Sequence, residues 1–192
     1  LLALDLDGTL LRHDQRVDDA DLAAIRELQT AGVAVTIVTG RLHSGATGAA
    51  RACGIEGAIA CMEGSHLVEL RSNRTLVHHA VEPALRDVLR ATFTEHGLAG
   101  FVFDAQGIHH DHGGAPYAGY VRTWSPNLRV VEEHLAWQTE PLATVAIGEP
   151  DAVAAVHAAL RAHADRLFSV SFAVSACPGK HAVLARAAGP SK

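Results

Sequence analysis

The sequence predicts an α/β fold in which a parallel-sheet core carries an inserted α+β layer. Residues 1–61 alternate strand-like apolar runs with helix-like segments, which is the rhythm of parallel strand–helix–strand units. From about residue 82 the pattern changes to helices followed by short paired strands, which is typical of an antiparallel layer. Polar residues that can carry chemistry stand where the first two predicted strands end.

The predicted core begins with the apolar run Leu1–Leu4, which is typical of a buried strand. After a polar loop, Asp18 or Asp19 can cap a helix that ends at Gly32. The β-branched run at residues 33–38 does not alternate with polar residues. This favours a second strand that is buried on both faces and runs parallel to the first.

The next predicted unit is an Ala-rich helix from about Ser44 to Cys53, followed by a short strand at Ala58–Cys61. Two further strand-like runs, Leu67–Leu70 and Thr75–Val81, flank a polar tetrapeptide that is typical of a turn. We therefore expect the core section to end in a hairpin.

Residues beyond this hairpin predict the inserted layer. Helices are expected at residues 83–97, 127–137 and 151–163, and strands at residues 101–103, 108–110, 142–147, 167–174 and 182–187. We predict a Rossmann-like core made of residues 1–81 and 178–192, with residues 82–177 forming an α+β cap domain.

Length and composition fit a globular protein with one core and a smaller inserted domain. The chain has 192 residues, 48% hydrophobic content and a formal net charge of -5, which gives no indication of a nucleic-acid or membrane surface. Its three cysteines are scattered and lack a Cys-x-x-Cys spacing, which favours reduced thiols in a cytoplasmic protein. No apolar run reaches membrane-spanning length, and the absence of an initiating Met suggests a trimmed start.

Two carboxylates, Asp5 and Asp7, stand where the first strand gives way to a Gly-containing turn. The two carboxylates repel each other unless a cation or a shared proton stabilises the pair. Hard oxygen ligands of this kind suit Mg2+, which commonly binds one or two carboxylates together with substrate phosphate oxygens. The alternative is a turn with Asp capping, which Asp-Gly alone would favour.

A hydroxyl, a glycine and a guanidinium follow the second predicted strand, at Thr39, Gly40 and Arg41. In an open parallel sheet, ligands gather at the carboxyl ends of the strands, so Asp5, Asp7 and Thr39 should lie at one edge. Thr39 can donate to a phosphate oxygen, and Gly40 lets the backbone approach closely. Arg41 is a lesser candidate, because a solvated Arg at a strand end is common.

Residues 4–10 resemble the first signature motif of the haloacid dehalogenase-like superfamily, and Val38-Thr-Gly-Arg41 is similar to the second motif of its Cof-type subfamily. The resemblance implies a Mg2+-dependent phosphatase in which Asp5 is the nucleophile and Asp7 the general acid and then base. It also implies that Asp5 and Asp7 hold the metal, and that Thr39 binds the phosphoryl group. The length of the inserted section fits the large cap of the Cof-type group.

Phosphoryl transfer also needs a fixed positive charge, and the chain contains only two lysines, Lys180 and Lys192. Lys180 lies in a Pro-Gly-Lys turn and fits an exposed turn lysine. Ser191-Lys192 follows an apolar strand and a short loop, which resembles the third superfamily motif. We therefore predict Lys192 as the lysine that contacts nucleophile and phosphate.

The chain departs from the family pattern in two places. The fourth motif, an acidic pair that completes the Mg2+ site, should follow Lys192, where this chain stops. The metal would then have Asp5, the main-chain carbonyl of Asp7, phosphate and water. Either a C-terminal portion is missing or catalysis is impaired, and a core of three parallel strands is small enough to favour the former. Glu63 stands where relatives often carry Asn.

The tract His109–His112 is compatible with a transition-metal site, since His110 and His112 would share one face of a strand. No Cys or further acidic cluster supports that interpretation, so a polar hairpin edge is favoured. The same hairpin, if it faced the core, would help to choose the substrate.

The leading hypothesis is a Mg2+-dependent phosphomonoesterase that acts on a small phosphorylated metabolite, such as a sugar phosphate, through an aspartyl-phosphate. A phosphomutase of the same superfamily would share this chemistry and return the phosphoryl group to the sugar. A third alternative, a non-catalytic phospholigand-binding protein, is motivated by the absent fourth motif. The residues name neither the substrate nor the oligomeric state.

Overall fold

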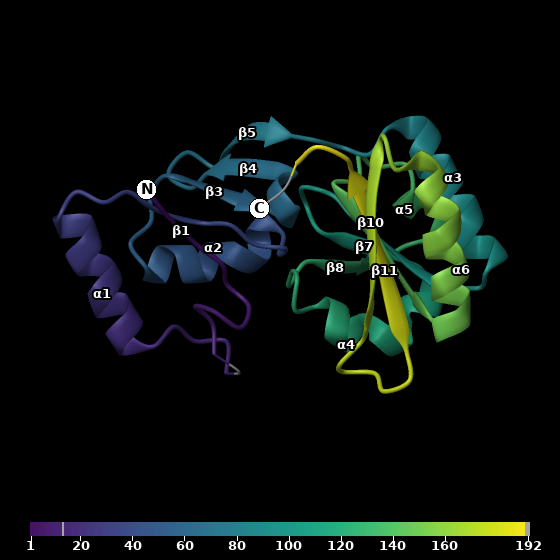
Figure 1. Cartoon of the computed structure of the whole chain (residues 1–192), viewed down its shortest axis with the longest axis horizontal. Helices are drawn as coiled ribbons and strands as arrows, with labels where there is room; N and C mark the ends of the chain where they lie inside the picture. Colours follow the sequence, from purple (N-terminus) through teal and green to yellow (C-terminus); the bar gives the residue numbers. More distant parts are fainter. Residues whose placement is uncertain (13, 191–192) are drawn as a thin grey trace. The chain divides into compact units, whose positions relative to one another are not determined.

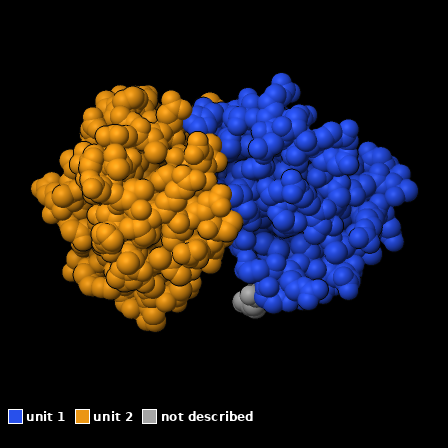
Figure 2. All heavy atoms as spheres, turned by 180° about the vertical axis from the view of Figure 1, so that it is seen from behind, with its two compact units in different colours: residues 1–78, 191–192 blue, residues 79–190 orange. Residues whose placement is uncertain are grey.

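The computed structural model describes residues 1–12 and 14–190 and divides them into two compact units. Residues 1–78 form the first unit and residues 79–190 the second (Figure 2). The first unit contains a two-stranded and a three-stranded sheet, the second a six-stranded sheet, and each unit has a hydrophobic cluster of its own. The predicted α/β class, with two folding styles in one chain, is confirmed.

The first unit alternates strands and helices as the sequence predicts (Figure 1). Its elements are β1 (Leu2–Leu4), α1 (Asp19–Thr30), β2 (Val35–Ile37), α2 (His43–Ala52) and β3 (Ala58–Cys61). β1 and β2 pair in parallel, and a parallel bridge between Val38 and Ala60 connects β2 to β3. Asp18 caps α1, because its carboxylate accepts a hydrogen bond from the N–H of Ala20 at 2.9 Å.

The predicted hairpin of this unit is confirmed. A single turn of 3-10 helix, η1 (Met62–Gly64), leads from β3 into β4 (His66–Glu69), which pairs with β3 and with β5 (Arg74–His78) in antiparallel fashion. β5 ends at His78, three residues earlier than expected.

The first two strands are less buried than the sequence predicts. Leu2 and Leu4 are only half-buried, and Ile37 is the only fully buried residue of β2. Within the residues that the structure describes, β1 pairs along one edge only, with β2, which leaves its other edge open. The apolar cluster of the unit instead centres on Ile37 and Ile59 of the sheet, packed against side chains of α1 and α2 such as Ile25.

The second unit is a six-stranded sheet whose strand order is β10-β11-β9-β6-β7-β8. These strands are β6 (Ala99–Phe103), β7 (Ile108–His110), β8 (Leu128–Val130), β9 (Ala143–Gly148), β10 (Leu167–Ala173) and β11 (His181–Ala187). Neighbouring strands are antiparallel except β7 and β8, so the expected antiparallel layer is largely confirmed.

Two helices, α3 (Pro83–Glu95) and α6 (Pro150–Leu160), pack on one face of this sheet (Figure 1). Leu89 and Phe93 of α3 and Val156 of α6 are buried against sheet residues such as Val102 and Val183. The remaining short elements are η2 (His112–Tyr117), α4 (Ala118–Val121), α5 (Glu133–Ala136) and η3 (Arg161–His163).

Two expectations about the second unit are wrong. The helix predicted at residues 127–137 is a strand, β8, followed by the single turn of α5, because Leu128–Val130 pairs with β7. Residues 178–190, expected with the core, belong to the second unit, since β11 pairs on one side with β9 and on the other with β10. In both cases pairing with distant strands decides the outcome, and local pattern does not show it.

The histidine tract is not the polar hairpin edge that the sequence favours. β7 lies between β6 and β8, and the side chains of His109 and His110 are buried. The Nε2 atom of His109 lies 2.9 Å from Oδ2 of Asp104, and the other oxygen, Oδ1, accepts the N–H groups of Gln106 and Gly107 in the β6–β7 turn. Burial would raise the pKa of Asp104, but the hydrogen bonds outweigh burial and lower it. This buried pair therefore ties the turn to the strand.

Cys53 and Cys61 are buried and Cys177 is partly buried, and all three are free thiols, as predicted. Burial raises the pKa of Cys61 to about 12, so this thiol is unreactive at neutral pH. None of the helices in the described part of the chain is long and apolar enough to cross a membrane.

Candidate active site

The loop after β1 brings Asp7 to the surface. Asp5 follows β1 directly, and the chain then folds back, with the N–H groups of Leu10 and Leu11 bonded to the carbonyl of Leu6 at 3.1 and 2.8 Å. Gly8 has a φ of +75°, a left-handed conformation that glycine adopts without strain. Asp5 is partly buried at the end of the strand, whereas 54% of the Asp7 side chain is exposed.

The second predicted motif leaves the sheet beside the first. The N–H of Val38 donates to the carbonyl of Leu4 at 2.9 Å, so the two parallel chains continue side by side beyond β1 and β2. Thr39 is fully buried, and its hydroxyl oxygen accepts the N–H of Arg41 at 3.1 Å, which leaves its proton available to an acceptor. The structure therefore brings Asp5 and Thr39 to the same edge of the sheet, as expected.

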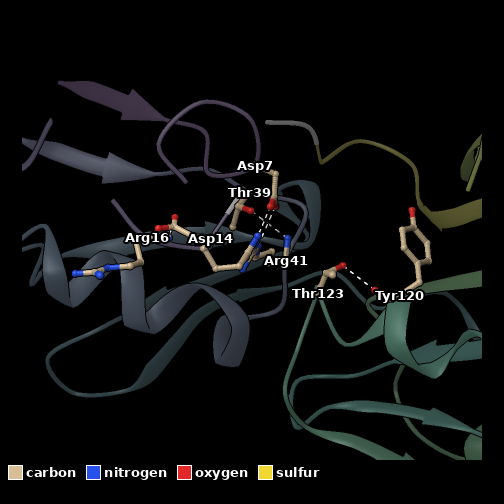
Figure 3. A network of polar contacts seen from close by, with 8 residues as sticks. Asp7, Asp14, Arg16, Thr39, Arg41, Tyr120 and Thr123 are labelled. Atoms are coloured by element: carbon tan, nitrogen blue, oxygen red, sulfur yellow. Dashed lines mark hydrogen bonds and ion pairs between the residues drawn. The ribbon is translucent and has the colours of Figure 1, made fainter. Parts of the chain in front are cut away.

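Arg41 holds the Asp7 carboxylate with two hydrogen bonds (Figure 3). Its Nε donates to Oδ2 at 2.9 Å and its Nη2 to Oδ1 at 2.5 Å. The Arg41 side chain is 8% exposed, so a buried cation fixes a carboxylate that itself faces solvent. A two-point contact of this kind sets the direction of the carboxylate as well as its place. Arg41 is therefore not the solvated strand-end arginine of the alternative interpretation.

The turn after β3 is hydrogen-bonded to the loop that contains Thr39 and Arg41. Glu63 donates its N–H to the carbonyl of Thr39 at 3.1 Å, and Met62 donates to the carbonyl of Arg41 at 2.9 Å. A Cβ on Gly40 would lie 2.7 Å from the Oε1 of Glu63. The close approach that a glycine allows here is thus made by the Glu63 side chain.

Two histidines near these loops are neutral at neutral pH. Burial, followed by the charges of His78 and His43, lowers the pKa of His66 to about 4. Burial and then Arg51 lower the pKa of His43. These imidazoles therefore carry no positive charge at neutral pH, and the cation that contacts Asp7 is Arg41.

A sequence model of the haloacid dehalogenase-like hydrolases matches residues 2–172, which is most of the chain. The chain belongs to the haloacid dehalogenase-like hydrolase family. The family that Asp5, Asp7 and Thr39 led us to expect is thereby confirmed.

Among curated proteins, this hydrolase is similar to two phosphatases over short stretches. A 5-amino-6-(5-phospho-D-ribitylamino)uracil phosphatase of Bacillus subtilis is 51% identical over 41 residues, which are 21% of this chain and 16% of that protein. An HMP-PP phosphatase of Yersinia pestis is 33% identical over 73 residues, which are 38% of this chain and 27% of that protein. The hydrolase thus matches less than a third of the length of either relative.

Solved structures share the fold of the hydrolase over nearly its whole length. A haloacid dehalogenase-like hydrolase from Bacteroides thetaiotaomicron superposes with a TM-score of 0.81 at 17% identity, covering 98% of this chain and 71% of that one. A sugar phosphatase of subclass IIB superposes with a TM-score of 0.75 at 14% identity, covering 99% and 70%. The fold implied by the Cof-type resemblance is confirmed.

The carboxylates after β1 can be compared with the donors that a Mg2+ ion needs. Asp5 and Asp7 supply the hard oxygen donors that Mg2+ prefers. Both carboxylate oxygens of Asp7 are bonded to Arg41, so its main-chain carbonyl is the donor that fits a metal. No group of three or more His, Cys, Asp or Glu residues able to hold a metal occurs within residues 1–12 and 14–190. The donor chemistry of Asp5 and Asp7 fits Mg2+.

The two lysines have different outcomes. Lys192 lies outside the described residues. Lys180 forms an ion pair with Glu149 in the second unit, and this hydrogen bond raises the pKa of the ammonium group. It behaves as the turn lysine that the sequence predicts.

Sequence reasoning missed Gln15, whose side-chain oxygen accepts a hydrogen bond from Nη2 of Arg41 at 2.5 Å. Gln15 lies in a polar turn with no motif of its own. The residue type does not predict the positive φ of 63°, because glutamine rarely adopts that conformation.

Proposed function

We propose that this hydrolase is a Mg2+-dependent phosphomonoesterase that acts on a small phosphorylated metabolite, such as a sugar phosphate. The observation that carries the proposal is the contact between Arg41 and the Asp7 carboxylate. Asp7 lies two residues after Asp5, and both follow β1 at the carboxyl end of the parallel strands. This arrangement places the Asp5 carboxylate, as the nucleophile, close in sequence to an Asp7 carboxylate that Arg41 orients for proton transfer. The phosphatase names of the two curated relatives support it.

In the first step a carboxylate oxygen of Asp5 attacks phosphorus while the bond to the ester oxygen breaks. Asp7 gives a proton to the departing oxygen, and an aspartyl-phosphate forms on Asp5. In the second step Asp7 takes a proton from water, which attacks phosphorus, releases inorganic phosphate and restores the Asp5 carboxylate. Arg41 orients Asp7 in both steps.

The phosphoryl oxygens need donors and positive charge. The Thr39 hydroxyl and the main chain at Gly40 lie at the same edge and can donate to them, and Lys192 is proposed as the fixed cation. The Asp5 carboxylate and the Asp7 carbonyl would hold Mg2+, whose charge offsets that of the phosphoryl group when it is bound.

The test is phosphate release by the full-length protein from sugar phosphates, nucleotides and p-nitrophenyl phosphate, with and without Mg2+. Release that depends on Mg2+ and disappears in Asp5→Asn, while Asp19→Asn on the first turn of α1 stays active, is the expected result. Phosphate release that persists in Asp5→Asn would rule out the covalent mechanism. Transfer of the phosphoryl group to a second sugar position, with little free phosphate, would identify a mutase instead.

A further inference from the structure

Gln15 adopts a backbone conformation that glutamine rarely takes. It lies in a tight turn closed by hydrogen bonds from Arg12 N–H to the Arg16 carbonyl at 3.1 Å and from Gln15 N–H to the Arg12 carbonyl at 2.9 Å. Its φ is 63°, in the left-handed region, where a side chain crowds its own backbone. A glycine would fit this turn without strain, so the glutamine side chain calls for an explanation.

The side chain reaches the guanidinium that holds Asp7. Nη2 of Arg41 carries two protons, and it donates to Oδ1 of Asp7 and to Oε1 of Gln15, each at 2.5 Å. With Nε on Oδ2 of Asp7, the guanidinium has fixed acceptors on two sides. A planar group bound at two sides cannot turn about its long, flexible stem as it could when bound at one.

We infer that Gln15 is a positioning residue for proton transfer by Asp7, acting through Arg41. This inference rests on the proposed function and assigns a task to a turn that carries no recognised motif. Proton transfer requires the carboxylate to stay within a fraction of an ångström of its working position, to about 0.5 Å. Arg41 provides that restraint only while the plane of its guanidinium is fixed, and Gln15 helps to fix this plane by accepting a hydrogen bond from the same Nη2 that donates to Asp7.

The decisive variant is Gln15→Gly, because it removes the side chain and also relieves the backbone strain. A merely structural role predicts a protein that is as stable as the wild type or more so, and equally active. Positioning predicts undiminished stability with a loss of turnover. We expect kcat to fall roughly tenfold, as for one lost hydrogen bond to a charged group, while KM changes by less than about twofold. Gln15→Glu keeps the accepting oxygen and should retain more of kcat than Gln15→Gly.

Asn73→Gly is the matched control. Asn73 also has a positive φ, 55°, in the β4–β5 turn of the same unit. Replacing it changes the backbone in the same sense without altering the Arg41 contacts, so its kcat should equal that of the wild type.

A second readout does not depend on activity. The Nε–H signal of Arg41 in a nitrogen–proton NMR spectrum, assigned with Arg41→Lys, should exchange with water several-fold faster in Gln15→Gly than in Asn73→Gly. Unchanged kcat together with an unchanged Arg41 signal would overturn the inference. If the wild type releases no phosphate, the proposed function fails, and the NMR comparison still decides whether Gln15 fixes Arg41.

Discussion

The Oε1 atom of Glu63 occupies the space beside Gly40 that a side chain on residue 40 would need, 2.7 Å from its Cβ position. The φ of Gly40 is not in the left-handed region, so the glycine is required by this contact and not by its backbone. The obstacle is the end of a flexible side chain, which can move away when residue 40 gains a methyl group. The two positions should therefore be energetically coupled.

We predict that Gly40→Ala destabilises the protein by about 1 kcal/mol in the presence of Glu63 and by less in a Glu63→Ala background. The measurement is a double-mutant cycle of unfolding free energies from urea denaturation. Gly48→Ala, in α2, where a Cβ meets nothing within 4 Å, is the control and should show no coupling to Glu63. Equal costs of Gly40→Ala in both backgrounds would contradict the contact.

Arg41→Lys should reduce turnover even though it keeps the positive charge. Lysine is a point charge and cannot bind both oxygens of Asp7 in the plane that the guanidinium sets. The loss of one hydrogen bond between charged groups corresponds to about 1.5–3 kcal/mol, or roughly a tenfold to hundredfold fall in kcat. Steady-state kinetics with the best phosphate ester would measure it. Arg16→Lys, an exposed arginine of the nearby turn, should behave as the wild type.

Much of this site could be predicted from the sequence, because its main parts follow single strands. Asp5 and Thr39 each stand just past a short apolar run, and parallel pairing of those runs suffices to bring them to one edge. Gln15 could not be found in this way. Its role depends on a left-handed turn and on a contact with Arg41, 26 residues away in sequence.

The same difference between local pattern and long-range contact explains where the predicted fold departs from the structure. β8 was predicted as part of a helix because its three residues carry little local information, and their pairing with β7 decides their conformation. β11 was expected with the core because it leads toward Lys192, whereas its hydrogen bonds go to β9 and β10. Local pattern indicates which segments are regular, whereas long-range pairing decides the conformation of β8 and the sheet that β11 joins.

His66 should make the first unit sensitive to acid. The residue is 3% exposed, and its Nε2 is hydrogen-bonded to the Thr75 hydroxyl at 3.1 Å. Burial, followed by the charges of His78 and His43, lowers the pKa of His66 from 6.5 to about 4. Between pH 6.5 and 4 the unfolded chain binds a proton at this imidazole and the folded chain does not. The free energy of unfolding is therefore highest above pH 6.5 and falls as the pH decreases below it. The loss amounts to about 3 kcal/mol at the acid end.

The test compares the pH dependence of unfolding free energy in the wild type, in His66→Gln and in His79→Gln. His66→Gln should flatten the dependence between pH 6.5 and 4, whatever its stability at neutral pH. His79→Gln, which removes an exposed neighbour of the β5 end, should leave the slope unchanged. Equal slopes in all three proteins would show that His66 is protonated in the folded state as easily as in the unfolded one.

Gly107 should be intolerant of any side chain, because the turn between β6 and β7 packs directly on the segment before β8. A Cβ there would lie 2.4 Å from the carbonyl oxygen of Asn127, which accepts the N–H of Ile108 at 2.8 Å. Backbone cannot move aside as a side-chain end can, so Gly107→Ala should cost about 1–3 kcal/mol of unfolding free energy. Gly119→Ala, where a Cβ meets nothing within 4 Å, should cost less than about 0.5 kcal/mol. Urea denaturation of the two variants measures the difference, and equal stability would mean that β8 does not pack against this turn in solution.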